Sequence, residues 1–355
     1  MPIPTEPIGS IPRPADLIAA WSDREAGRIS SEQFDKIGEA ALRDTIQRFE
    51  ATGSPVITDG EQTKPSFATY PLAGFTRLAP DGVVIPFADG HTRQLPRLTA
   101  GPFHYVTYAS QYFAAARRLT DAPLKQAVIS ASALSLLYPA TGIPGYSREA
   151  FLSDLVDEAV ADIRRCLVHG ADSVQIDFTE GRLSLKLDPS GGLLENFVAL
   201  NNRVLDHFSP LELRRIGVHT CPGGDRDATH SADVDYAGLL PMLFRLRVGR
   251  FYVQLASEKG AVRVLQIIRQ HLQPDQILFA GVIDPINPKI ETPEQVRDRI
   301  LQAAEYLPVA QLGSTDDCGF SPFADDTSTS RDIAFAKIRA RVIGTKLAAE
   351  KLGRA

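Results

Sequence analysis

Short apolar runs alternate along the chain with longer stretches whose apolar residues recur at helical spacing. The runs are rich in β-branched residues and end at polar residues or glycine, which is typical of buried parallel strands. We predict eight strands, the first being the extended segment before Ile8. The other seven are 56–58, 126–129, 173–176, 216–218, 251–253, 277–283 and 309–312.

The stretches between the strands carry helix signals. Ser147 precedes an acidic first turn, as an N-cap does, and apolar residues then recur at the helical period as far as Cys166. Thr292 followed by Pro293 opens a second helix to about residue 306. We predict a last helix, rich in Ala, Lys and Arg, over 330–352.

Strand and helix units that alternate in this way imply parallel strands joined by crossovers. Eight units in 355 residues predict a fold of the α/β class, a (β/α)8 TIM barrel spanning residues 1–355 as a single domain. A doubly wound open sheet is the alternative. Residues 64–105 do not follow the alternation of strands and helices and contain many Gly, Pro and aromatic residues. We therefore predict an inserted, hairpin-rich excursion there.

Composition removes several classes of function. The chain is 44% hydrophobic, which supports a full core, and its net charge of -5 with no basic run argues against a nucleic-acid partner. Three cysteines do not make a disulfide framework. We see neither a signal peptide nor an apolar run of the roughly 20 residues that cross a bilayer, and we expect a cytoplasmic protein without membrane contact.

The strongest chemical signal is the pair His219 and Cys221, one residue apart, with Cys318 far downstream. Imidazole and thiolate ligands suit zinc, and three protein ligands with an open fourth position are typical of a catalytic site. An open zinc with two thiolates is suited to ionising another thiol, so the sequence points to alkyl transfer to sulfur. We expect the third cysteine, Cys166, and the single Trp21 to serve packing.

Other polar residues also follow the predicted strands. In a barrel the carboxyl ends of the strands meet at one face, where active sites are built. We therefore expect distant residues to converge there, namely Ser10, Glu61, Asp177, His219, Cys221, Gln254, Asp284 and Cys318.

Six short motifs surround these residues. They are Ile8-Gly9-Ser10-Ile11-Pro12-Arg13-Pro14, Asp59-Gly60-Glu61, Gln175-Ile176-Asp177, His219-Thr220-Cys221, Gly281-Val282-Ile283-Asp284 and Asp317-Cys318-Gly319. In this order they resemble the catalytic half of cobalamin-independent methionine synthase and its short relatives, over essentially the whole chain. The resemblance implies a (β/α)8 barrel, a zinc ion and methyl transfer to the thiol of homocysteine, giving methionine.

The resemblance also implies substrate-binding roles. Glu61 and Asp177 match residues that hold the ammonium group of homocysteine, and the loop of Ile8, Gly9 and Ser10 matches the one that takes its carboxylate. Two neighbouring acids favour a cation between them, because otherwise one pKa rises. The alternatives are that Asp177 caps a loop and that Glu61 pairs with Lys64.

The chain departs from the family in two respects. The family's full-length synthase has two barrels and this chain has room for one, so we expect a methylated corrinoid or corrinoid protein, rather than folate, as methyl donor. The family supplies a fourth zinc ligand, a Glu, where this chain has Gln254. Glu258, four residues on, is the alternative.

Two further residues are candidates for catalysis. Asp284 ends an apolar strand, where it would hydrogen-bond a zinc ligand or a catalytic water, or else cap a loop. His230 follows the His-x-Cys motif in a Gly-rich loop. It is a candidate acid for the leaving group, with an exposed loop histidine as the favoured alternative.

Three functions compete. The leading one is a zinc-dependent methyltransferase acting on a small thiol, most readily homocysteine. The second is a zinc-dependent epoxyalkane:coenzyme M transferase type of enzyme, whose sulfonate substrate would need a cation such as Arg13 or Lys64. The third is a non-catalytic zinc or corrinoid accessory protein.

Overall fold

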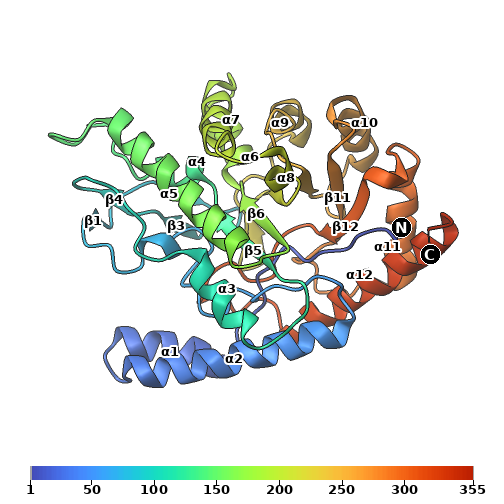
Figure 1. Cartoon of the computed structure of the whole chain (residues 1–355), viewed down its shortest axis with the longest axis horizontal. Helices are drawn as coiled ribbons and strands as arrows, with labels where there is room; N and C mark the ends of the chain where they lie inside the picture. Colours follow the sequence, from blue (N-terminus) through green and yellow to red (C-terminus); the bar gives the residue numbers. More distant parts are fainter. Residues whose placement is uncertain (1, 355) are drawn as a thin grey trace.

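The computed structural model describes residues 2–354 and confirms the α/β class and the barrel (Figure 1). Six parallel strands form its continuous sheet, in the order β12-β11-β10-β7-β6-β5. They are β5 (Lys125–Ile129), β6 (Ser173–Asp177), β7 (Ile216–Thr220), β10 (Arg250–Val253), β11 (Ile277–Ile283) and β12 (Leu312–Asp316).

The two remaining predicted strands close the barrel. Thr5 pairs with Ser314 of β12, and Ile57 pairs with Leu124 beside β5, both in parallel. The Thr58 hydroxyl then donates to the carbonyl of Gly9 over 2.9 Å, which joins the two segments to each other. Prolines at positions 4, 7 and 55 remove backbone donors next to these segments, so each is reduced to an isolated bridge.

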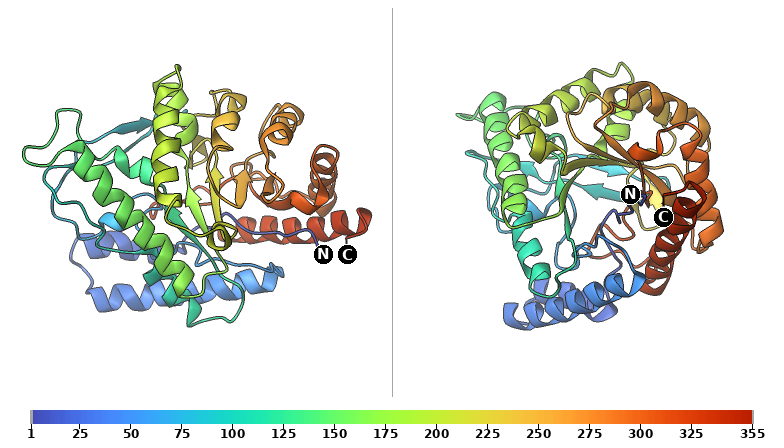
Figure 2. Two further views of the ribbon diagram at one scale, coloured as in Figure 1. Left: turned by 45° about the horizontal axis from the view of Figure 1, so that its top comes forward. Right: turned by 45° about the vertical axis from the view of Figure 1, so that its right-hand side comes forward.

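Helices surround this sheet (Figures 1 and 2). The predicted starts are confirmed, because the Ser147 hydroxyl accepts from Ala150 and Thr292 forms a capping box with Gln295. The helices are α1 (Ala15–Glu25), α2 (Ser31–Thr52), α3 (Ala109–Arg117), α4 (Ala131–Ser135), α5 (Arg148–Val168), α6 (Glu180–Leu187), α7 (Gly192–Leu205), α8 (Pro210–Leu213), α9 (Tyr236–Leu243), α10 (Ala261–His271), α11 (Pro293–Ala304) and α12 (Arg331–Lys351).

The excursion within 64–105 is present. After the short helix η1 (Tyr70–Leu72), β1 (Leu78–Ala79) pairs with β4 (Arg97–Leu98), and β2 (Val84–Pro86) pairs with β3 (Thr92–Gln94), both antiparallel. A second, smaller hairpin joins β8 (Gly224–Asp225) to β9 (Ala228–Thr229) just after the His-x-Cys motif.

The predicted bounds of the last strand, 309–312, were wrong. Residues Val309–Gln311 form the 3-10 helix η2, whose turn is closed by the Gln311 amide donating to the carbonyl of Pro308 over 2.8 Å. The strand itself begins at Leu312 and ends at Asp316. Cys318 therefore lies two residues past the end of its strand, whose last residue Asp316 pairs with Ile283 at the end of β11.

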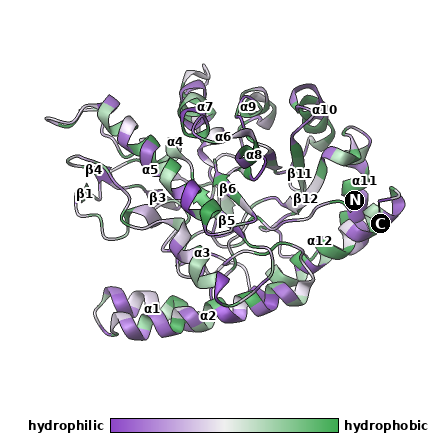
Figure 3. Ribbon diagram, viewed as in Figure 1, coloured by the Kyte–Doolittle hydropathy of each residue, from purple (hydrophilic) through white to green (hydrophobic). Residues whose placement is uncertain are grey.

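Apolar residues fill the space between strands and helices. In Figure 3 the helices alternate hydrophilic and hydrophobic residues, and the buried residues of α2 include Phe34, Leu42, Ile46 and Phe49. Among residues 2–354, none of the helices combines the length and apolar character needed to cross a membrane.

Candidate metal and substrate site

Three zinc-type ligands converge at the carboxyl ends of the strands. His219 lies in β7 and Cys221 follows it at a spacing of two, which directs both side chains to the same face of the strand. Cys318 arrives from the loop after β12. The possible ligand atoms of the three residues lie within 4.8 Å of one another, and the two sulfur atoms are 3.0 Å apart as free cysteines.

The environment of His219 fits a metal. Both of its ring nitrogens are buried and neither has a hydrogen-bond partner within the described chain. A buried polar atom without a partner costs roughly 1–3 kcal/mol, and an ion bound between one of these nitrogens and the two sulfurs would remove that cost for the nitrogen that binds it. The shared hydrogen bond lowers the pKa of Cys318 well below its usual range and raises that of Cys221. The donor set suits zinc.

Asp317 holds the loop that carries Cys318. Its carboxylate accepts from the backbone amides of Leu255, Ala256 and Ser257, at 2.9, 2.9 and 2.7 Å, and from the Ser257 hydroxyl at 2.7 Å. Burial raises the pKa of Asp317 to about 6. It stands next to Cys318 in the sequence motif, yet nothing local in the sequence indicates that it binds the loop after β10.

Gln254 lies beside Cys221, one of the three candidate metal ligands. Val253 pairs with Thr220 in the β10–β7 register, so Gln254 follows β10 next to Cys221. Its side-chain oxygen accepts from Arg182 over 3.3 Å and its amide nitrogen donates to Ser257 over 2.8 Å. Glu258 also contacts Arg182, at 3.4 Å. Both proposed fourth ligands are thus engaged by one buried arginine, and their role as ligands stays a prediction.

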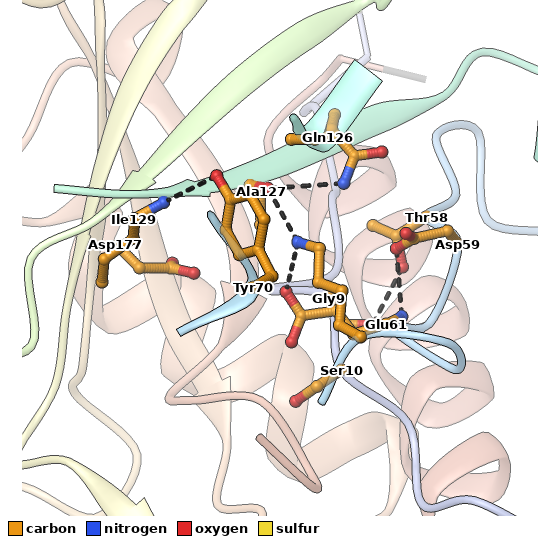
Figure 4. Close-up of polar contacts among 12 residues, drawn as sticks. Gly9, Ser10, Thr58, Asp59, Glu61, Tyr70, Gln126, Ala127, Ile129 and Asp177 are labelled. Atoms are coloured by element: carbon orange, nitrogen blue, oxygen red, sulfur yellow. Dashed lines mark hydrogen bonds and ion pairs between the residues drawn. The ribbon is translucent and has the colours of Figure 1, made fainter. Parts of the chain in front are cut away.

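A cavity of about 300 Å³ opens onto two of the candidate metal ligands, His219 and Cys318. Among its lining residues are Ile8, Ser10, Glu61 and Asp177 from the predicted substrate set, together with His219 and Cys318. Figure 4 shows the side chains of Ser10, Glu61 and Asp177. Gly9 contributes its carbonyl to barrel closure, as described above.

Glu61 forms the ion pair that was the alternative to a substrate role. Lys64 donates to its carboxylate over 3.1 Å and to the carbonyl of Ala127 over 2.9 Å, and its ammonium lies 4.7 Å from the ring centre of Tyr70. Burial nevertheless raises the pKa of Glu61 to about 7. Its φ of 54° is unusual for a residue with a side chain, a strain that clusters at functional sites.

Asp177 ends β6 and its side chain lines the cavity. Its carboxylate accepts from Gln175 over 2.7 Å, and Gln175 in turn accepts from Lys125 over 2.8 Å, so its hydrogen bond runs back along the strand and not to a loop amide. Burial raises the pKa of Asp177. Two carboxyls with raised pKa values therefore face one cavity, as expected where a cationic group binds.

His230 is buried, and the favoured expectation of an exposed loop histidine was wrong. The β8–β9 hairpin folds back, so that the His230 amide donates to the carbonyl of Gly223 over 3.1 Å and the ring meets Phe87 edge-on. The side chain lines the cavity, and burial lowers its pKa to about 4. A Cβ atom on Gly223 would lie 1.7 Å from His230 Nε2, so this approach requires glycine.

Asp284 adopts the loop-capping geometry. Its carboxylate accepts from the amides of Ile286 at 3.1 Å and Asn287 at 3.4 Å, and it does not line the described cavity. The structure thus favours the capping alternative, and a catalytic role stays a prediction.

The Arg13 side chain is hydrogen-bonded to backbone carbonyl groups. Its guanidinium donates to the carbonyls of five residues, and this binds the first loop to the two loops on either side of it. Neither Arg13 nor Lys64 is therefore free for an anionic substrate. The carbonyls belong to Glu61, Gln62, Lys64, Ser321 and Phe323.

The packing expectations hold for the remaining residues. Cys166 is fully buried in α5, and Trp21 meets Phe34 edge-on at 4.6 Å. The hairpin residues Phe87 and Arg93, which border the cavity, were missed, because no local signal links them to residues more than a hundred positions away.

Comparison with known proteins gives consistent matches over the full length. The chain is 26% identical over 364 residues to a methionine synthase of Saccharolobus solfataricus, with 99% of this chain and 96% of the relative covered. It is 23% identical over 359 residues to a methionine synthase of Sulfurisphaera tokodaii, covering 99% and 94%. Its fold matches that of a B12-independent methionine synthase from Shewanella with selenomethionine, at a TM-score of 0.78, 19% identity and full coverage of both chains. No family model matches.

Proposed function

Because the chain is similar over nearly all its residues to methionine synthases and shares the fold of a B12-independent methionine synthase, we propose that it belongs to the cobalamin-independent methionine synthase family. We propose that it is a zinc-dependent methyltransferase converting homocysteine to methionine. The observation that carries this proposal is the juxtaposition of a His-Cys-Cys ligand set and two carboxyls of raised pKa on one small cavity. A thiol and an ammonium group on one small molecule satisfy both.

Each side chain has a proposed role. His219, Cys221 and Cys318 hold zinc, with Gln254 as the proposed fourth ligand. When bound, zinc supplies a positive charge that makes a substrate thiol ionise at neutral pH. The carboxylate of Asp177 and the carboxylate oxygen of Glu61 that does not accept from Lys64 bind the substrate ammonium. The loop of Ile8, Gly9 and Ser10 binds the substrate carboxylate.

The reaction is an in-line displacement. The substrate thiol releases its proton to solvent, and its sulfur then forms a bond to the methyl carbon while the bond from that carbon to the donor breaks. The electron pair of the broken bond leaves with the donor. His230 is the proposed hydrogen-bond donor to the leaving group, and its pKa of about 4 makes it a neutral N–H donor at pH 7. Asp284 would act only through the loop that it caps.

The proposed methyl donor is a methylated corrinoid or corrinoid protein. A donor of this kind would present its methyl group at the mouth of the cavity, since about 300 Å³ is at the lower end of the volumes that hold a drug-sized ligand. Methionine formation from homocysteine with methylcobalamin, but not with methyltetrahydrofolate, is the expected result.

The coenzyme M alternative has less support. Its sulfonate would need a free cation, and Arg13 and Lys64 are bound to backbone carbonyls and to Glu61 respectively. The accessory-protein alternative has no observation in its favour.

X-ray absorption at the zinc edge tests the proposal directly. We expect two sulfurs around zinc in the resting protein and three after homocysteine is added. Cys318→Ala should leave one sulfur at rest, while Cys166→Ala, which alters a cysteine in the α5 core, should leave two. A third sulfur with coenzyme M alone would move the assignment to the epoxide-type reaction, and no third sulfur with either thiol would end the thiol-activation proposal.

A further inference from the structure

Two loops that are far apart in the sequence meet beside the cavity. The first, residues 8–13, follows the first strand segment, and we call it the Ser10 loop. The second, residues 317–323, follows β12, and we call it the Cys318 loop. Ser10, Cys318 and Gly319 all line the cavity. One loop therefore carries a candidate substrate contact and the other a candidate metal ligand.

Ser10 is hydrogen-bonded twice to the Cys318 loop. The amide of Phe320 donates to the carbonyl of Ser10 over 3.0 Å, and the amide of Ser321 donates to the Ser10 hydroxyl oxygen over 3.2 Å. Ser10 and Ser321 are both buried, so breaking the second bond would leave a buried amide without a partner. Ser10 therefore cannot move relative to the Cys318 loop unless both bonds break.

The close approach of the two loops depends on a glycine. A Cβ atom on Gly319 would lie 2.1 Å from Ser10 Oγ, so a side chain at this position would push the loops apart. Arg13 adds two more bonds, because its guanidinium donates to the carbonyls of Ser321 at 3.2 Å and Phe323 at 2.8 Å. The two loops thus form one unit, and the residue at their contact directly follows Cys318.

The Ser10 hydroxyl can transmit the binding of an anion to this unit. Because its oxygen accepts from the Ser321 amide, its own proton remains for an acceptor in the cavity. A substrate carboxylate is such an acceptor, and hydrogen bonds to a charged group are the stronger kind. Consecutive hydrogen bonds polarise one another, so a hydroxyl that donates to a carboxylate also accepts more strongly. Binding at Ser10 should therefore order the loop that carries Cys318.

We propose that Ser10 couples substrate and metal binding, so that the amino acid part of the substrate tightens zinc binding even when no thiol is present. This inference rests on the proposed function for the identities of substrate and metal. Ser10 acts here as a positioning residue, because it reaches the metal only through the Cys318 loop. The coupling is reciprocal, so zinc must tighten binding of the amino acid by the same factor.

L-Norvaline isolates this effect, because it has the skeleton of homocysteine with a methyl group in place of the thiol. The zinc Kd is measured by competition with a chromophoric chelator, in saturating L-norvaline or in the same concentration of D-norvaline. The enantiomers bind free zinc equally, so the ratio of the two Kd values reports on the protein alone. Zinc should bind at least about fivefold more tightly with L-norvaline, and calorimetric titration of zinc-loaded and zinc-free protein with L-norvaline should give the same factor.

Two glycine variants separate the coupling from a general disturbance of the Cys318 loop. Gly319→Ala places a methyl group against Ser10 and should reduce the ratio of Kd values to about one. Gly224→Ala is the matched control, because its Cβ atom would lie 3.8 Å from Cys318 Sγ, an ordinary contact, and does not meet Ser10. This control should keep the wild-type ratio within about twofold, as changes without a clash do.

The variants also define what contradicts the proposal. If Gly319→Ala does not fold, Ser10→Ala takes its place and should likewise give a ratio of about one. A ratio of about one in the wild type would overturn the coupling. So would an unchanged ratio in the variant that disturbs Ser10, or an equal loss in Gly224→Ala.

This test and the zinc-edge test can fail independently. A raised ratio with L-norvaline, but no third sulfur after homocysteine is added, would overturn the thiol reaction and keep the coupling. A third sulfur with homocysteine, but equal zinc affinities in the two enantiomers of norvaline, would overturn the coupling alone.

Discussion

Buried acids near the strand ends are compensated in different ways, and Glu180 is the extreme case. Glu61 has Lys64, whereas Glu180 accepts hydrogen bonds only from the hydroxyls of Ser130 and Ser132, and its second oxygen has no partner within the described chain. Burial raises the pKa of Glu180 to about 7. Its protonated form is therefore the one that the fold favours.

Glu180→Gln should change how stability depends on pH. A folded pKa of about 7, above the ordinary 4.5, means that wild-type stability is full below pH 4.5 and falls as pH rises through 7. Between pH 5 and 8 this loss is at most about 2.5 kcal/mol, and the variant should lack it.

Urea unfolding at the two pH values measures the difference. Glu39→Gln, which alters an exposed glutamate on α2, serves as control and should keep the wild-type pH profile. Parallel pH profiles for wild type and Glu180→Gln would refute the assignment.

At the scale of elements, the ends of β10, β11 and β12 are bound together at Asp317. Its carboxylate binds the loop after β10 as described, and the neighbouring strand β11 leaves room for it only because residue 281 is glycine. A Cβ atom at Gly281 would lie 2.0 Å from the Asp317 carboxylate oxygen.

Gly281→Ala should therefore weaken zinc binding without touching a ligand. Displacing Asp317 moves the Cys318 loop, and changes to groups that orient metal ligands cost about 10–100-fold in affinity. Competition with a chromophoric chelator gives the zinc Kd. Gly260→Ala is the control, because a Cβ atom there meets nothing within 4 Å. Equal zinc affinities for the two variants would show that Asp317 does not position the ligand loop.

Local signals were sufficient for elements that are stabilised locally. Hydroxyl caps at Ser147 and Thr292 predicted two helix starts, because the cap and its partner are three residues apart. The start of β12 was predicted wrongly, because the preceding residues, Val309 to Gln311, form a 3-10 turn. Strand pairing with β11 decides the bounds of β12, and that partner is about thirty residues away.

On the scale of the whole molecule, the amino-terminal ends of the strands enclose a buried charged cluster. Glu6 accepts from Arg250 and from the Tyr252 hydroxyl, each over 2.6 Å, and lies 3.8 Å from Lys125. Lys125 also lies over the ring of Tyr252 at 4.1 Å, and burial lowers its pKa to about 8. Glu6 belongs to the first strand segment, so this cluster helps to close the barrel.

Glu6→Ala should destabilise the protein by about 3 kcal/mol or more, because it leaves buried cations without their carboxylate. Urea unfolding gives the change in free energy. The double variant Glu6→Leu with Lys125→Met, which removes charges of both signs, should recover part of the loss. A loss below about 1 kcal/mol for Glu6→Ala would show that the cluster is not needed for closure.

The site was predictable only in part. His219, Cys221, Cys318, Glu61 and Asp177 follow strands, and parallel strands bring their carboxyl ends to one face. The burial of His230 and its contact with Phe87 depend instead on how two hairpins fold over that face. Their contacts join residues such as Arg93 and Asp325, 232 positions apart, which no periodicity records.

Closure by the first strand has a consequence for synthesis on the ribosome. The hydroxyls of Thr5 and Ser314 meet at 2.8 Å although 309 positions separate them in the chain. At about 5–20 residues per second, the first strand is made roughly 15–60 seconds before its partner. Until then the nascent sheet has open edges that invite wrong pairing. Since Cys318 is made later still, the candidate metal site is completed only after the strands of the barrel.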